Sequence, residues 1–409
     1  MPDPYVESIA FGQRLQILRT RRGMSRTVLA GLVGRSPSWL KQVETGVIQP
    51  PKLPMILRIA EVLRVRDLAD LTGEQSMSVE MFIGPGHRRL PAVREAINAL
   101  PSTTEHPATS PRVVRSRVTA AWAARHQAAN HREALGRLLP DLIRDAQLCA
   151  RQADTGEQRR AATAALAEVY ALAQFFLAYQ PDSSLLWRVA ERSMIAAQDA
   201  DDPRMIGVAA WLIGQAHRDA AHYDAADAAH LQALEYLEPL LPDAGHRVLA
   251  TAGALRFEAG YTAARRGDTG TAWGYWDAAR ATARRLPADY YDPITSFGQA
   301  IMGAHAVTVA VELHAGGESV RQVAAADATT IPSRPRRARH RIEAARGYQL
   351  DGQPGAALAT LALAHEAAPE TIRYNGYARR IILEETESPS PARRRRASEL
   401  AVKMGLLAA

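Results

Sequence analysis

The sequence has little of what disulfide-bonded, metal-caging or membrane-spanning chains require. Its 409 residues include a single cysteine, Cys149, which excludes an internal disulfide and a site built from several thiolates. No stretch approaches the roughly 18 consecutive apolar residues of a transmembrane helix. The first ten residues, MPDPYVESIA, lack the basic segment and apolar run of a secretory signal. We therefore expect a cytoplasmic protein that does not span a membrane.

Motifs of the common enzyme classes are also missing from the sequence. There is no phosphate-binding loop of the G-x-x-x-x-G-K type and no G-x-S-x-G nucleophile elbow. The histidines are scattered, and His217, His222 and His230 do not have the i, i+4 spacing of a helical metal pair. We therefore expect no enzymatic activity, no bound metal and no cofactor.

Lysine is scarce, and the basic residues are unevenly distributed. Of 50 basic residues only Lys41, Lys52 and Lys403 are lysines, which indicates a GC-rich coding bias and weakens arguments from arginine abundance. Residues 11–58 hold nine basic residues and one acid, Glu44, although the whole chain is only +7. A compact basic module on a near-neutral body is typical of a polyanion-binding head with a separate partner domain. The alternative is a solvated basic surface without a partner.

The basic module has the periodicity and the caps of four successive helices. Apolar residues at helical spacing predict a first helix from Phe11, and the Ser25 hydroxyl can cap a second. Gly34 ends the second helix in a tight turn, and Ser36 can cap a third. Two short helices joined by a glycine-containing turn form a helix-turn-helix. A fourth helix is predicted over Leu53–Leu63 and a final turn over Asp67–Gly73.

This module resembles the lambda-repressor-like, or XRE-type, DNA-binding domains, especially those of actinobacterial regulators with a helical-repeat C-terminal region. The resemblance runs from Leu15 to Leu63, within LQILRTRRGMSRTVLAGLVGRSPSWLKQVETGVIQPPKLPMILRIAEVL. It implies that the helix from Ser36 to Thr45 enters the major groove of DNA while the preceding helix crosses the backbone. The matching positions are Leu29, Ala30, Gly34, Ser36, Val43, Glu44, Gly46, Ile59, Ala60 and Leu63.

The resemblance also implies which side chains of the groove helix contact DNA. Leu40 and Val43 are three residues apart and should face the core. Gln42 would read an adenine edge, and Lys41 a guanine or a phosphate. Trp39 has two possible roles, one at the DNA and one as a structural lid on the fourth helix. The full set of expected DNA-contacting residues is Arg26, Arg35, Ser36, Ser38, Trp39, Lys41, Gln42 and Lys52.

Three charged residues depart from the family pattern or are unusual within the module. Arg26 stands where family members often carry glutamine, which favours a phosphate or guanine contact. Arg35 replaces a small apolar residue, so it either contacts a phosphate or extends into solvent. Glu44, the lone acid, is expected to pair with Arg14 or Arg19 and to fix the third helix.

The rest of the chain is expected to be helical. No strand-like alternation follows residue 112, and turn signals separate Ala-rich helical patterns. Residues 74–112 are rich in Pro, Ser and Thr around one short helical stretch, RLPAVREAINAL, and are predicted to form a linker. We predict an all-α protein with a five-helix DNA-binding domain over 1–73, this linker, and a helical-repeat domain over 113–409.

Three helical hairpins of the repeat domain fit the tetratricopeptide pattern of small residues at fixed positions. Their spacing exceeds the roughly 34 residues of a strict repeat, so longer helices are expected. A weaker unit is predicted at 294–326, one or two more at 113–200, and a terminal capping helix after Arg393–Arg396. The pattern residues are Ile213, Gly214, Ala226 and Ala233; Gly260, Ala272, Trp276 and Ala279; and Ala345, Tyr348, Ala357, Leu361, Ala364 and Pro369.

Together these parts predict a transcriptional regulator that binds double-stranded operator DNA in the cytoplasm, at the nucleoid. A single head makes few phosphate contacts, so a homodimer on an inverted repeat is expected. The repeat domain is expected to dimerise and to sense a small molecule or peptide on its concave surface. The alternative is a protein-interaction scaffold that the head delivers to DNA. The candidate effector-binding residues are Trp211, Trp273, Trp276, Tyr290 and Tyr291, for which packing between repeats is the competing role.

Overall fold

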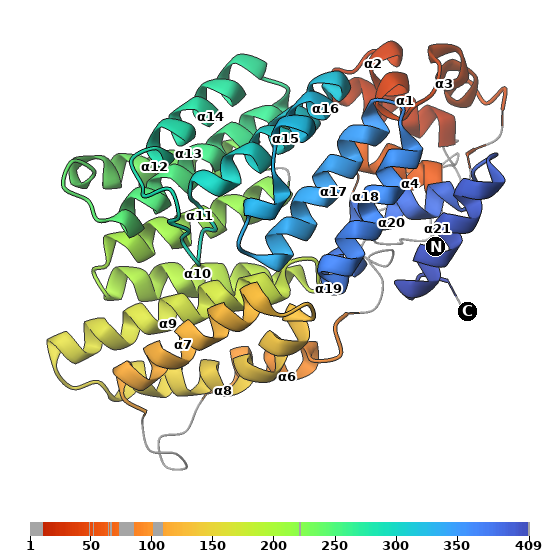
Figure 1. Ribbon diagram of the computed structural model, residues 1–409. Helices are drawn as coiled ribbons and strands as arrows, with labels where there is room; N and C mark the ends of the chain where they lie inside the picture. The colour runs from red at the N-terminus through yellow and green to blue at the C-terminus, as the bar shows by residue number, and fades with distance from the viewer. Residues whose placement is uncertain are drawn as a thin grey trace, which may run out of the picture.

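The structure is a computed structural model that describes residues 11–48, 50–51, 53–63, 65, 68–72, 86–100, 109–220 and 222–407. Across these residues the chain is helical, and its one β feature is an isolated bridge between Tyr291 and Gly298. Five short helices lie against the C-terminal part of a curved array of helix pairs (Figure 1). We call these two parts the head and the body. The predicted all-α architecture is confirmed.

The head begins and ends its helices where the sequence signals predicted. Ser25 Oγ accepts a hydrogen bond from Val28 N at 3.2 Å, and Ser36 Oγ accepts one from Trp39 N at 3.1 Å. Each such cap contributes about 1 kcal/mol to helix stability. Gly34 takes a φ of +70° in the turn between the second and third helices. The head helices are α1 (Phe11–Arg21), α2 (Arg26–Leu32), α3 (Pro37–Glu44), α4 (Leu53–Leu63) and α5 (Ala69–Thr72).

The body consists of longer helices, most of them in antiparallel pairs (Figure 1). Three short 3₁₀ turns at Glu238–Leu240, Gln299–Ile301 and Ala328–Thr330 occur between them. The body helices are α6 (Leu90–Asn98), α7 (Pro111–Gln127), α8 (His131–Gln152), α9 (Gly156–Leu177), α10 (Ser183–Asp199), α11 (Pro203–Asp219), α12 (Tyr223–Leu237), α13 (His246–Arg266), α14 (Thr269–Ala283), α15 (Met302–Glu312), α16 (Gly316–Ala325), α17 (Arg334–Leu350), α18 (Pro354–Ala367), α19 (Pro369–Arg373), α20 (Gly376–Glu385) and α21 (Pro391–Lys403).

The predicted hairpins correspond to α11 and α12, α13 and α14, and α17 and α18. The weaker unit is α15 and α16, the segment before residue 200 folds as α7 to α10, and α21 is the terminal helix. Small residues allow the close packing that the repeat pattern requires. A Cβ on Gly260 would lie 2.9 Å from Ala272 O, and a Cβ on Gly214 would overlap the ring of His230.

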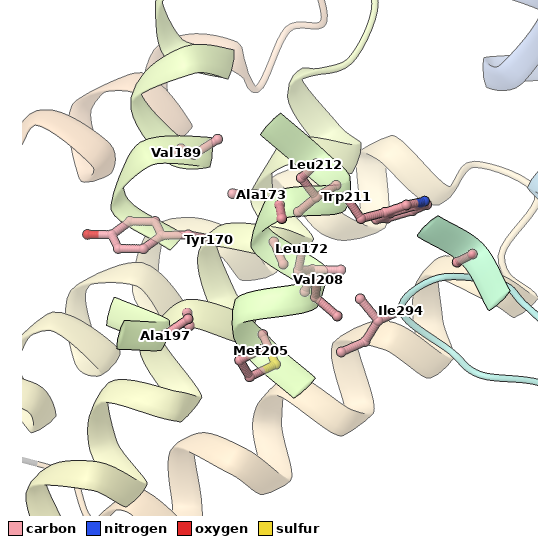
Figure 2. Packing of buried hydrophobic residues seen from close by; sticks show 14 of the residues in the cluster. Tyr170, Leu172, Ala173, Val189, Ala197, Met205, Val208, Trp211, Leu212 and Ile294 are labelled. Carbon is pink, nitrogen blue, oxygen red and sulfur yellow. The ribbon is translucent and has the colours of Figure 1, made fainter. Parts of the chain in front are cut away.

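The largest apolar core runs through α6 to α15. Figure 2 shows a part of it, where Trp211 and Val208 of α11 lie near Leu172 and Ala173 of α9. The short helix expected within the linker, α6, packs against α8 and contributes Leu90, Val93 and Ile97 to the same core. Its apolar face is buried because α6 packs against α8 and α10.

The body curls back on itself, so that the start of α17 contacts the end of α7. His126 at the end of α7 is 2.8 Å from Ser333 Oγ, which precedes α17. Arg339 on α17 donates to the Tyr179 hydroxyl at 2.8 Å. These contacts narrow the concave side of the body at this junction.

The head is held against the last helices of the body by charged side chains. Arg58 on α4 is 3.4 Å from Glu384 on α20, and Arg380 on α20 is 2.9 Å from Glu61 on α4. All four side chains are at most one third exposed. The position of α20 therefore influences the orientation of the head.

Candidate DNA-binding head and body cavity

Helix α3 presents polar side chains to solvent on one face and packs the other into the head. Ser38, Lys41 and Gln42 are exposed, whereas Leu40 and Val43 are buried, as expected from their spacing. Burial of a leucine of this kind stabilises the fold by about 1.5–3 kcal/mol. A ligand can therefore contact the exposed row of Ser38, Lys41 and Gln42 without disturbing the core.

The remaining expected DNA-contacting residues differ in how much of their side chain is free. Ser36 uses its hydroxyl as the cap of α3. Trp39 is half-buried against the head core, and the Arg35 guanidinium carbon lies 5.5 Å from the centroid of its ring. Arg35 itself is exposed, and Lys52 lies outside the described residues. Both roles considered for Trp39 are compatible with this position.

Glu44 forms ion pairs with two arginines of the head. Arg19 donates from Nε to Glu44 Oε1 at 2.5 Å and from Nη2 to Oε2 at 3.2 Å, as one of the two predicted pairings requires. Arg26 Nε donates to the same Oε2 at 2.6 Å, a contact that the sequence did not indicate. The Arg26 side chain is 37% exposed, so it is anchored at one end and accessible at the other. This network fixes α3 relative to α1 and α2.

The concave side of the body contains a cavity of about 410 Å³. Its apolar walls include Phe175 of α9, Leu212 of α11 and Phe257 of α13. Its polar side chains are chiefly arginines and histidines from α7, α8, α11, α13, α15 and α17. Cavities of roughly 300–1,000 Å³ with apolar walls and a few polar groups are typical of small-molecule sites.

Several charged side chains of this cavity belong to a network of buried ion pairs. Arg218 pairs with Glu258, and Arg339 Nη2 lies 2.5 Å from Glu343 Oε1. Behind them Glu312 accepts from Arg346 at 2.6 Å. Burial alone would raise the pKa of Glu312, but the charges of Arg346 and Arg265 outweigh it and lower that pKa to about 2. The Glu312 carboxylate is therefore ionised at neutral pH.

The five aromatic residues expected at an effector site do not meet in one place. Trp273 and Trp276 line a second, more open cavity of about 540 Å³ beside α15 and α16. Trp211 is buried and packs on Phe175, with ring centroids 5.9 Å apart. Tyr290 and Tyr291 lie in the connection between α14 and α15. Tyr290 OH is 3.4 Å from Asp292, and the Tyr291 ring meets His126 edge to face.

The cavity arginines were not among the candidates from the sequence. Arg336 and Arg339 belong to the run Arg334–Arg341, which reads as a charged helix start. A usable signal was present, because Ala338, Ile342 and Ala345 of the same helix are apolar and buried. The basic residues of this helix alternate with these buried residues. Some of the basic side chains must therefore lie partly inside the body.

Among the described helices, none combines the length and the apolar character that a membrane span needs. In the same part of the chain, no three histidine, cysteine or carboxylate side chains converge as metal ligands.

Comparison with known proteins gives a family match for the head and distant structural likenesses for the longer chain. Residues 10–72 match a family described as a helix-turn-helix domain. Among solved structures the chain is similar to PlcR of Bacillus thuringiensis in complex with the peptide PapR7 and DNA, at 10% identity and a TM-score of 0.28, over 86% of this chain and 98% of that one. It is also similar to ComR of S. thermophilus in complex with DNA and its signalling peptide ComS, at 16% identity and a TM-score of 0.21, over 68% and 94%.

No curated protein matches the sequence. At these low TM-scores the two structural likenesses carry no geometric argument, whereas the family match spans all five helices of the head. Residues 10–72 therefore match a helix-turn-helix domain, which is joined here to a body of paired helices.

Proposed function

We propose that the protein is a sequence-specific transcriptional regulator whose head reads operator DNA and whose body responds to an effector. The observation that carries the proposal is the exposed row Ser38, Lys41 and Gln42 on α3. The helix that bears it is capped by Ser36 and held by the Arg19–Glu44 pair, so the row has a fixed geometry. Lys41 supplies a phosphate or guanine contact and Gln42 an adenine contact. Arg26, Arg35, Trp39 and Lys52 are proposed to add to this surface.

The body is proposed to act on the head through α20. Tyr377 on this helix lines the 410 Å³ cavity, whereas Arg380 and Glu384 on the same helix pair with the head. A shift of α20 by an occupant of the cavity would therefore move the groups that hold the head. An effector changes DNA binding in this way only if it binds the two positions of α20 unequally.

Homodimerisation is part of the proposal because a single head has a small electrostatic footprint. Two heads on one dimer engage half-sites about one helical turn apart and gain affinity through effective concentration. The expected operator is an inverted repeat. The aromatic residues Trp273 and Trp276 are proposed as a second effector or partner surface, since they line the more open cavity.

The test is selection of bound sequences from random double-stranded DNA by the full-length protein at about 0.15 M salt. Enrichment of an inverted repeat with fixed spacing supports a dimeric operator-binding regulator. Enrichment of a single half-site supports DNA reading by a monomer and removes the dimer from the proposal. If no sequence is enriched while a partner protein co-purifies with the body, the scaffold function replaces it.

A further inference from the structure

The charges around the body cavity do not balance. Within the described residues six arginines line the cavity, but only three carboxylates do, those of Asp219, Glu258 and Glu343. Arg218, Arg265 and Arg339 pair with Glu258, Glu312 and Glu343 respectively. Arg132 donates to the carbonyl oxygens of Phe175 and Phe176 at 3.1 and 2.5 Å, and its backbone N donates to Glu370.

Arg125 and Arg336 remain, and neither has an ion-pair partner within 4.0 Å in the described part of the chain, although Arg125 Nη1 lies 3.3 Å from His126 Nδ1. Arg125 is 5% exposed and lies 4.1 Å above the Phe175 ring. Its Nε, and the Nε of Arg336, are buried without a hydrogen-bond partner. Arg336 Nη2 lies only beside the ring nitrogen of His305, at 3.3 Å.

The neighbouring titratable groups do not compensate these two charges. Burial, followed by the charge of Arg336, lowers the pKa of His305 well below its usual range. Burial also lowers the pKa of His340 to about 4, so both rings are neutral at pH 7. Arg125 is affected by the same surroundings. Burial and the charges of Arg336 and Arg132 lower the pKa of its guanidinium to about 9. At neutral pH the buried guanidinium of Arg125 and the partly buried guanidinium of Arg336 therefore line the same cavity without a paired anion.

Proteins do not retain buried, unpaired charges of one sign for stability, because each pays desolvation without a Coulombic return. An anion between the two guanidinium groups would restore the balance and satisfy the unpartnered N–H groups. The rings of Phe175 and Phe257 beside them supply an apolar surface for the rest of a ligand. A volume of about 410 Å³ suits a small organic molecule rather than an extended peptide.

We infer that the effector is a small organic anion, whose carboxylate or phosphate is held between Arg125 and Arg336 and whose apolar part lies against Phe175 and Phe257. This inference rests on the proposed sensing role of the body and names the chemical class that it senses. Arg125 and Arg336 come from α7 and α17, the two helices at which the body closes. Binding of an anion there would draw these helices together.

The first experiment measures thermal unfolding and calorimetric binding of the full-length protein with simple probes. Phenylacetate and phenyl phosphate carry the anion, and phenylacetamide is the neutral match of the carboxylate. We expect both anions to raise the melting temperature in titrations to about tenfold above their Kd, and phenylacetamide not to do so. Arg125→Gln and Arg336→Gln should each weaken anion binding by about tenfold or more. Arg284→Gln, at an exposed position at the end of α14 and outside both cavities, is the control and should bind normally.

The second experiment needs no ligand. Because Arg125 and Arg336 are unpaired, Arg336→Gln should raise the melting temperature of the unliganded protein. Arg339→Gln removes a cation that is paired with Glu343 and should lower it. A fall in melting temperature for Arg336→Gln equal to that for Arg339→Gln would show that Arg336 is structurally compensated and would overturn the inference.

The remaining outcomes are also decisive. Equal binding of phenylacetamide and phenylacetate would exclude an anion site, yet DNA selection would still establish the regulator. A four-residue peptide with a free terminal carboxylate that binds more tightly than N-acetylphenylalanine would overturn the small-molecule assignment in favour of a peptide. The stronger of the two anionic probes identifies the head group as carboxylate or phosphate.

Discussion

Arg380 on α20 and Glu61 on α4 form a 2.9 Å ion pair that joins the last part of the body to the head. Together with Arg58 and Glu384 it makes a two-pair contact between helices that are far apart in the sequence. Because these side chains are only partly exposed, each pair should contribute about 1 kcal/mol to docking of the head. The contact is strong enough to orient the head and weak enough to be released.

The double variant Glu61→Gln and Glu384→Gln should release the head from the body without unfolding either. We expect a larger radius of gyration in small-angle scattering and faster proteolysis between the two parts. Asp141→Asn, which removes an exposed pair with Arg144 on α8, is the matched control. The difference should shrink at high salt because partly exposed pairs are screened. An unchanged radius of gyration would mean that apolar contacts alone hold the head.

Replacement of Lys41 and Gln42 by alanine should abolish sequence preference and leave the fold intact. Each good base contact contributes about 1–3 kcal/mol of discrimination, whereas both side chains are exposed and support no core. Binding to operator and to random DNA, measured over a range of salt concentrations, should become equal. The exposed Gln16 on α1 provides a control, Gln16→Ala, that should keep its preference. Retained specificity in the double variant would assign DNA reading to another helix.

Glu44→Gln should destabilise the head selectively. The variant leaves Arg19, which is 8% exposed, without its charge partner. Loss of one member of a buried pair costs about 3–5 kcal/mol, a large share of the stability of a small domain. Thermal unfolding should split into an early head transition and an unchanged body transition, with DNA binding lost at the first. Glu95→Gln, at an exposed position on α6, should unfold like the wild type.

The stability of the body should fall as the pH drops below about 6.5, in part because of His126. Its Nε2 lies 2.7 Å from Pro293 O and its Nδ1 2.8 Å from Ser333 Oγ. Burial, followed by the charge of Arg125, lowers the pKa of His126 to about 3. The unfolded chain therefore binds one more proton than the native chain between pH 6.5 and about 3, which favours unfolding as acid is added.

His126→Asn should remove the additional proton that the unfolded chain binds. Over this range the dependence of the unfolding free energy on pH should become less steep by about 1.4 kcal/mol per pH unit. His246→Asn, at an exposed position, is the control. Identical pH profiles for wild type and His126→Asn would show that this ring does not titrate differently on unfolding.

Gly214→Ala tests the close approach of α11 and α12. A Cβ at this position overlaps the buried ring of His230, so overpacking should cost about 1–3 kcal/mol. At Gly274 on α14 a Cβ meets nothing within 4 Å, so Gly274→Ala should instead stabilise the protein by up to about 1 kcal/mol. Melting temperatures that move in opposite directions would confirm that only the first glycine is needed for packing.

Local features of the chain were predictable because their causes are local. Ser25 and Ser36 mark helix starts by their own hydroxyl groups, and Leu40 and Val43 are buried because helical spacing places them on one face. The hairpins of the body followed from small residues such as Gly214 and Gly260. Even Glu44 was assigned a structural role, since it is the lone acid in a basic segment.

Features that depend on closure of the body were not predictable from the sequence. Arg125 and Arg336 meet only because α7 and α17 come together, and no local pattern relates them. Whether an aromatic side chain faces the core or a cavity likewise depends on tertiary packing. Trp211 packs in the core while Trp273 lines a cavity, and the difference depends on which helices pack against each of them. Their proposed roles in effector binding remain predictions.

Closure also bears on how this architecture can change during evolution. In an open solenoid each repeat contacts only its neighbours, so a unit can be gained or lost at little cost. Here an inserted or deleted hairpin would separate His126 from Ser333 and break the junction between α7 and α17. The number of hairpins is therefore constrained like the number of strands in a closed barrel, and related chains should vary in loop length rather than in repeat number.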